Sequence, residues 1–410
     1  MGNLLGSPVT EKETHEGVFA TNSESPILYG VSSMQGWRVH MEDAHITEPV
    51  VYASEAVAQN ESSPTTYNRI DLSGHAIFAV FDGHGGTFAA AYSGRNLCRV
   101  LSKEPKFIAY AKFEQERPGK EAQVSSYQAK QQYRESGLKL LKAALCDAFV
   151  NLDREIASAL RGQPVKDADL PYHPKTTAAT SSTEAETAGT STAMESDGTT
   201  TDTADEEDAP KGMEEEGDSG TTACVVVLTP HFVVCANAGD SRAVMSRSGH
   251  KAVPLSFDHK PDDISEEQRI RAAGGYVVGG RVEGDLAVSR GLGDFRFKNM
   301  DVVMKATDNH QTTPGDPQDP APQDNQPGSS TRRPQPQMSP GEQKVSPIPD
   351  IIVQNRDNED DEFILVACDG IWDVQANDEA VHTVADLFEE GESSLGLVCE
   401  EVNTKHRFGI

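Results

Sequence analysis

The stretch that decides the fold is TACVVVLTPHFVVCANAGD, which spans residues 222–240. It holds two short apolar runs, at 222–228 and 232–237, and both are rich in β-branched and aromatic residues. Runs of this length and composition favour buried strands. The Thr229-Pro230 pair between them is a typical turn signal. The stretch therefore predicts two buried strands joined as an antiparallel hairpin.

Similar patterns on both sides of the hairpin predict the remaining elements. Two more buried strands are expected, at 76–81 and 363–368. Helical periodicity is found in five segments: 87–101, 136–160, 264–273, 377–389 and 394–404. Strands and helices come in groups instead of alternating along the chain. This grouping predicts an α+β fold, with antiparallel sheets and helices packed outside them.

Acidic residues recur where apolar runs end. Asp82 and Asp369 each follow such a run directly, Asp240 comes shortly after the hairpin, and Asp373 lies four residues beyond Asp369. Carboxylates that converge at strand ends repel one another unless cations neutralise them, and oxygen ligands of this kind select Mg²⁺, Mn²⁺ or Ca²⁺ over Zn²⁺. Gly83, which follows Asp82, would let the backbone turn sharply or approach a ligand. Ordinary Asp-Gly turns are the alternative interpretation at each position alone.

Two further positions suggest phosphate chemistry. Glu42 and Asp43 offer adjacent carboxylates, and in a strand Arg38 would lie on the same face as Glu42. A guanidinium beside metal-binding acids suits a phosphate, whereas an Arg–Glu surface pair is the alternative. His84 is the best general-acid candidate, because an unperturbed imidazole can donate a proton near neutral pH.

Composition limits the partners. The net charge of −29 argues against nucleic acid as a partner, because phosphate backbones require clustered Lys and Arg. The sequence has no apolar stretch long enough to span a membrane and no secretory signal, and its six cysteines are scattered. We therefore expect free thiols and an intracellular protein, cytoplasmic and/or nuclear, that functions as a monomer. The Met1-Gly2 start leaves N-terminal myristoylation open, with weak membrane contact, as an alternative to a plain terminus.

Two segments have compositions that cannot form a core. Residues 175–218 are rich in Thr, Ser, Ala and acid, and residues 306–347 are rich in Pro, Gln and Asp. Such segments cannot bury enough apolar surface to offset the entropy of ordering. We expect a flexible N-terminus over 1–25 and a single domain over 26–402, interrupted by these two disordered inserts. Residues 403–410 are expected to form a truncated C-terminal end.

These residues together resemble the protein phosphatase 2C family of metal-dependent phosphatases. The resemblance covers about 26–160 and 217–402, apart from the Pro-rich insert. It is carried by seven motifs in family order: residues 33–45 (SMQGWRVHMEDAH), 81–86 (FDGHGG), 219–223 (SGTTA), 237–242 (NAGDSR), 258–261 (DHKP), 286–294 (LAVSRGLGD) and 367–373 (ACDGIWD). It implies a central β-sandwich of two antiparallel sheets flanked by helices on both sides. It also implies a protein serine/threonine phosphatase that hydrolyses phosphoserine and phosphothreonine with a metal-activated water at a two-metal site.

The resemblance further implies a role for each site residue. Asp82 would bridge two Mg²⁺ or Mn²⁺ ions, with Gly83 offering its carbonyl, and Asp369 and Glu42 would act at one metal each. Arg38 would hold the phosphate and His84 would protonate the leaving oxygen. Asp43 would support the residues that bind the two metals. Asp240 and Asp373, together with Asp369, would form a weaker third metal site. Residues 258–280 resemble a flap that influences substrate choice.

The C-terminal part departs from the family pattern. Family members usually continue to an Asp-Asn motif, whose Asp ligates a metal, and then to a closing strand, whereas this sequence stops at Ile410. We expect one metal to lack a ligand and one sheet to show an exposed edge or a gap. An alternative function follows, in which the protein is a catalytically impaired module that binds phosphoproteins and regulates them without turnover.

Overall fold

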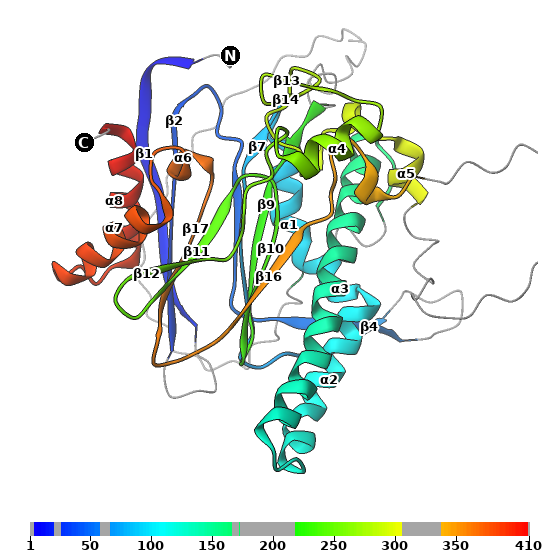
Figure 1. The fold of residues 1–410 in the computed structure, drawn as a ribbon, viewed down its shortest axis with the longest axis vertical. Coiled ribbons are helices and arrows are strands. Elements are labelled where there is room, and N and C mark those ends of the chain that lie inside the picture. Colours follow the sequence, from blue (N-terminus) through cyan, green and yellow to red (C-terminus); the bar gives the residue numbers. More distant parts are fainter. Residues whose placement is uncertain are drawn as a thin grey trace, which may run out of the picture.

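A computed structural model describes residues 4–19, 26–57, 66–165, 172, 218–305 and 338–408. Gly2, where myristoylation was left open, and residues 175–217 of the acidic insert lie outside the described residues. The described chain builds four layers, in which two antiparallel β-sheet layers lie between two layers of helices (Figure 1). This is the predicted α+β sandwich.

The first β-layer is a five-stranded sheet in the order β16-β10-β9-β6-β3. Its strands are β3 (Ala44–Glu48), β6 (Ala76–Phe81), β9 (Ala223–Leu228), β10 (Phe232–Ala238) and β16 (Asp350–Asn355). β9 and β10 form the expected antiparallel hairpin, in which Val234 pairs with Val227. All six residues of β9 are buried, because this central strand is covered on both faces.

The second β-layer has two parts. The larger part is a three-stranded sheet in the order β12-β11-β17, with strands β11 (Arg242–Arg247), β12 (Lys251–Pro254) and β17 (Asp361–Ala367). The smaller part pairs β1 (Leu4–Phe19) with β2 (Ile27–Arg38). The core between the two layers includes Val226 of β9 and Met245 of β11.

Helices cover both outer faces of the sandwich (Figure 1). The five-stranded sheet packs against α1 (Phe88–Lys103), α2 (Pro105–Ala122) and α3 (Tyr127–Leu160), with which it forms the largest core cluster. The second layer packs against α7 (Asn377–Glu389) and α8 (Leu395–Phe408). The predicted helices correspond to α1, α3, α4, α7 and α8. α3 begins earlier than predicted, after Ser126, whose hydroxyl accepts a hydrogen bond from the Ala129 amide.

Short elements complete the fold near the ends of the main strands. The paired strands are β4 (Tyr52–Val57) with β5 (Thr66–Asp71), β13 (Val277–Val278) with β14 (Arg281–Val282), and the ribbon of β7 (Gly83–His84), β8 (Gly220–Thr221) and β15 (Leu292–Gly293). The short helices are α4 (Ile264–Ala272), α5 (Met300–Lys305), α6 (Asp369–Trp372) and the 3₁₀ turns η2 (Phe295–Phe297) and η3 (Pro340–Glu342).

The N-terminal segment differs from the flexible stretch expected over 1–25. Residues 4–19 form β1, which pairs along β2 and also contacts α8. The Glu16 carboxylate accepts hydrogen bonds from the Ser394 hydroxyl (2.9 Å) and the Gly396 amide (3.0 Å) at the start of α8. Strand pairing and these polar contacts hold a segment whose polar sequence gives no strand signal.

The Pro-rich insert is also shorter than the predicted 306–347. Residues 338–347 are described, and Val345 is fully buried beside Ile270 and Phe297. The remainder of this insert, residues 306–337, lies outside the described residues.

The expected strand that would place Arg38 and Glu42 on one face is not observed. β2 ends at Arg38, and Glu42 lies in the loop before β3.

Candidate active site

Two carboxyl groups meet where one strand of each β-layer ends. Asp82 follows β6 of the five-stranded sheet, and Asp369 follows β17 of the second layer as the first residue of α6. Their carboxyl groups lie within hydrogen-bonding reach of each other. Burial raises the pKa of Asp82 well above its usual value, and the nearby charges of Asp43, Asp369 and Asp240 raise it further. The sandwich thus gathers acids that repel one another.

The loop between β2 and β3 adds Glu42 and Asp43 to this cluster. Desolvation by the surrounding protein raises the pKa of Asp43, although hydrogen bonds from the Cys368 thiol (3.1 Å) and the Gly83 amide act to lower it. Glu42 accepts a hydrogen bond from the Gly86 amide at 3.0 Å. A Cβ on Gly83 would lie 2.1 Å from the Glu42 carbonyl oxygen, so only glycine permits this crossing of the two loops.

Asp240 and Asp373 lie at the edge of the cluster. Asp240 is almost fully buried after β10, and the ammonium group of Lys260 binds its carboxylate. Asp373 is exposed, and its charge helps to raise the pKa of Asp369, which burial raises most. The structure therefore brings together all the acids that the sequence analysis selected. It adds Lys260, whose motif the sequence analysis quoted without assigning it a role.

His84 is held by a partner that the sequence analysis did not select. Its Nε2 lies 2.8 Å from Oδ1 of Asp294, a residue 210 positions further along the chain. Burial lowers the pKa of His84, but the charge and hydrogen bond of Asp294, with the charges of Asp240 and Glu42, outweigh burial and raise it. A signal was present, because Asp294 follows Gly293 as Asp240 follows Gly239.

A large cavity of about 1870 Å³ opens beside the cluster. Its lining includes Arg38, the exposed last residue of β2, together with Asp43, Asp82, Asp369 and Asp373. A ligand in the cavity would therefore meet a guanidinium and several carboxyl groups at once. Asp240 and His84 do not line the cavity, although their charges act on the cluster from beside it.

The same cavity runs between β2 and β17. Residues 27–38 of β2 and 361–367 of β17 contribute much of its wall. Within the described chain, β17 pairs only with β11 and β2 pairs only with β1. The facing edges of these two strands are therefore open to the cavity.

The donor set tests whether a divalent cation fits this cluster. Among the described residues, no group of three or more His, Cys, Asp or Glu side chains is already arranged to hold a metal ion. Nevertheless, Asp82, Asp43 and Asp369 all have raised pKa values, because burial and mutual repulsion disfavour their charges. A cation would relieve that repulsion, and a set of oxygen donors suits Mg²⁺ or Mn²⁺. The chemistry of these oxygen donors therefore fits Mg²⁺ or Mn²⁺.

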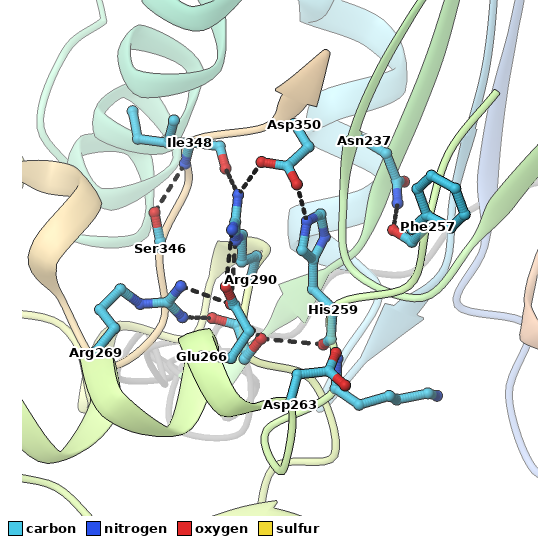
Figure 2. A network of polar contacts seen from close by, with 12 residues as sticks. Asn237, Phe257, His259, Asp263, Glu266, Arg269, Arg290, Ser346, Ile348 and Asp350 are labelled. Carbon is cyan, nitrogen blue, oxygen red and sulfur yellow. Dashed lines mark hydrogen bonds and ion pairs between the residues drawn. The ribbon is translucent and has the colours of Figure 1, made fainter. Parts of the chain in front are cut away.

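A buried ionic network includes residues of α4, in the segment 258–280 that resembles a flap (Figure 2). Glu266 of α4 accepts hydrogen bonds from Arg269 (2.6 Å), Ser289 (2.6 Å) and Arg290 (2.7 and 3.1 Å). Arg290 also donates to Asp350, at the first residue of β16, at 2.7 Å. The network fixes α4 to the five-stranded sheet.

The fold and the site define a class of proteins, helix-flanked β-sandwiches with an acidic cluster where strands of both layers end. The sequence profile of one such family, protein phosphatase 2C, matches residues 27–158 and 165–406. The chain belongs to the protein phosphatase 2C family.

Individual relatives agree with this assignment. The chain is 32% identical over 384 residues to protein phosphatase 2C homolog 2 of Aspergillus flavus, covering 94% of this chain and 59% of the relative. It is 33% identical over 405 residues to a probable protein phosphatase 2C of Caenorhabditis elegans, covering 99% of this chain and 74% of the relative. The chain thus spans only about three fifths of the fungal relative.

A solved structure supports the fold. The crystal structure of a serine-threonine phosphatase 2C from Toxoplasma gondii aligns over 98% of this chain and 93% of its own. The TM-score is 0.51 at 16% sequence identity. Separately, none of the described helices is both long and apolar enough to span a membrane.

Proposed function

We propose that this protein removes phosphate from phosphoserine and phosphothreonine residues of other proteins. The observation that carries the proposal is the meeting of Asp82 and Asp369 from opposite β-layers, in a cleft that Arg38 also lines. Membership of the protein phosphatase 2C family supports the same reaction class.

The cluster would hold two Mg²⁺ or Mn²⁺ ions. The residues that would bind or support them, with a weaker third ion included, are Asp82, the Gly83 carbonyl, Asp369, Glu42, Asp43, Asp240 and Asp373. Divalent cations at this position would supply charge neutralisation, a lowered pKa of bound water and orientation of the phosphate oxygens. The described side chains would have to move together slightly to hold them, since no formed group is present there.

The chain's own residues do the remaining work. Arg38 lines the cleft and would bind phosphate oxygens through its guanidinium group. His84 donates Nε2–H to Asp294, which leaves Nδ1 to carry a proton for the leaving serine or threonine oxygen. The raised pKa of His84 favours the protonated imidazole that a general acid requires.

The test measures phosphate release from phosphoserine and phosphothreonine peptides in Mn²⁺ or Mg²⁺. Asp82→Asn should abolish release and weaken Mn²⁺ binding measured by calorimetry. The same variant should raise the melting temperature in excess chelator, because it replaces an acid whose charged form is disfavoured by burial and by neighbouring carboxylates with a neutral amide. Asp71→Asn, at an exposed position on β5, is the matched control and should behave as wild type.

Two outcomes would count against the proposal. Release that persists in excess chelator would exclude the metal-dependent reaction. Tight phosphopeptide binding with no release in either metal would instead favour the regulatory module that binds without turnover.

A further inference from the structure

Asp294 has an environment that simple loop packing does not explain. Its side chain is 3% exposed, and one carboxylate oxygen, Oδ1, contacts His84 Nε2. The other oxygen, Oδ2, is buried and has no hydrogen-bond partner among the described residues. Leaving a buried carboxylate oxygen unpaired is costly, at roughly 1–3 kcal/mol. A residue of purely structural value would be expected to satisfy both oxygens.

The backbone around Asp294 is also constrained. Its φ is 53°, a left-handed conformation that is uncommon outside glycine. The carboxylate presses on Gly220, where an added Cβ would lie 2.3 Å from Asp294 Cγ. The Asp294 amide donates to the Ser219 carbonyl at 3.1 Å. The 219–220 segment and the loop at Asp294 therefore fit together with the carboxylate enclosed between them.

A second buried pair fixes the loop that carries Asp294. The Lys298 ammonium group is fully buried and lies 2.8 Å from Asp153 of α3. The same Asp153 oxygen accepts the Gly293 amide at 2.8 Å, and Lys298 also donates to the Gly291 carbonyl at 2.9 Å. α3 thus holds the loop on both sides of Asp294, so the carboxylate has little freedom to move away from His84.

We propose that Asp294 is the positioning residue for His84. It accepts Nε2–H, fixes the plane of the imidazole, and leaves Nδ1–H directed to the leaving oxygen. In the reaction, the oxygen of the attacking water forms a new bond to phosphorus as the bond to the serine or threonine oxygen breaks, and the Nδ1 proton passes to that leaving oxygen. The proton that the attacking water gives up then restores Nδ1–H, so the products are the free hydroxyl group and inorganic phosphate. This inference rests on the proposed function, and it assigns to Asp294 a role that acts only through His84.

The first test compares two substrates whose leaving groups differ in their need for a proton. Asp294→Asn should lower kcat for a phosphoserine peptide by about 10²-fold or more, the usual range for a general acid. Its kcat for p-nitrophenyl phosphate, whose leaving group departs without a proton, should stay within about threefold. KM for both substrates should be unchanged. An equal loss of kcat on both substrates would overturn the proposal.

The second test is a double-variant cycle. In a His84→Ala background, adding Asp294→Asn should cause no further loss with the phosphopeptide, because the group that Asp294 positions is already missing. A full additional loss would show that Asp294 acts independently of His84. Asp294→Gly suits the left-handed backbone and removes the carboxylate, so it replaces Asp294→Asn if that variant does not fold.

A third readout does not depend on turnover, so it separates this inference from the proposed function. The imidazole ¹⁵N–¹H spectrum should show a protected Nε2–H for His84 in the wild type and not in Asp294→Gly. A wild-type protein that releases no phosphate from phosphopeptides would refute the proposed function alone. An Nε2–H signal unchanged by Asp294→Gly would refute the positioning role, whatever the activity.

Discussion

Replacing Glu266 by glutamine tests whether the buried ionic network secures α4. The Glu266 carboxylate is 4% exposed and accepts four hydrogen bonds, three of them from the guanidinium groups of Arg269 and Arg290 (Figure 2). Glutamine has nearly the same shape, but its amide would present N–H groups to guanidinium donors. Both arginines would then be left half-buried without their shared counter-charge.

The magnitude follows from two independent estimates. Burial raises the pKa of Glu266, but Arg290, Ser289 and Arg269 outweigh it and hold the pKa at about 2, against the usual 4.5. That difference corresponds to ~3 kcal/mol of stability at neutral pH. Removing one member of a buried ion pair costs about 3–5 kcal/mol in other proteins. We therefore expect Glu266→Gln to lower the free energy of unfolding by ~3 kcal/mol at pH 7.

The stabilisation that Glu266 provides should decrease as the pH falls. Because the folded pKa is depressed, the contribution of Glu266 is fully present above pH 4.5 and is lost as the pH falls from 4.5 towards 2. Urea unfolding, followed by circular dichroism at pH 7, 4.5 and 3, should show the wild type and Glu266→Gln converging as the pH falls.

The matched control lies one residue away. Glu267 forms a solvent-exposed pair with Arg271 on the same helix, so Glu267→Gln should cost no more than about 0.5 kcal/mol at any pH. If Glu266→Gln destabilised the protein no more than Glu267→Gln, the network would not secure α4 in the way argued.

Two further predictions concern other buried groups. Burial lowers the pKa of His75 to about 4, so its neutral ring, bonded to Tyr110, should make the free energy of unfolding fall by ~3 kcal/mol between pH 6.5 and 4. His75→Gln should flatten that slope in urea unfolding, and an unchanged slope would assign the acid sensitivity elsewhere. Lys298→Met should cost ~3 kcal/mol, because it strands the buried carboxylate of Asp153. Adding Asp153→Asn should recover much of that loss in thermal unfolding, and a further loss would contradict the charge argument.

Local pattern predicted the central strands because they are buried on both faces, whereas the sandwich itself was implied by the family resemblance. An apolar run such as β9 fits only a strand covered on both sides, whatever the rest of the chain does. The sequence analysis also expected Gly83 to allow a close approach of the backbone. The structure agrees, because the Glu42 carbonyl leaves no room for a side chain at Gly83. The sequence analysis could therefore select Asp82 and Asp369, which follow β6 and β17, as candidate metal ligands without knowing that they lie together.

Local pattern failed where distant contacts determine structure. β1 is polar, and its strand form depends on pairing with β2 and on bonds to α8, nearly 400 residues away in the chain. α2 carries Pro118 in its interior, and its packing against α3 holds it as a helix that the sequence did not signal.

The sequence by itself determined the central apolar strands and the acids that follow them, because burial and backbone freedom are properties of short segments. Only the tertiary structure decided that Asp82 faces Asp369 across two layers, that Lys260 neutralises Asp240, and that Asp294 holds His84. These contacts join residues from separate elements. No local preference encodes such distances, because they arise only when the sheets pack.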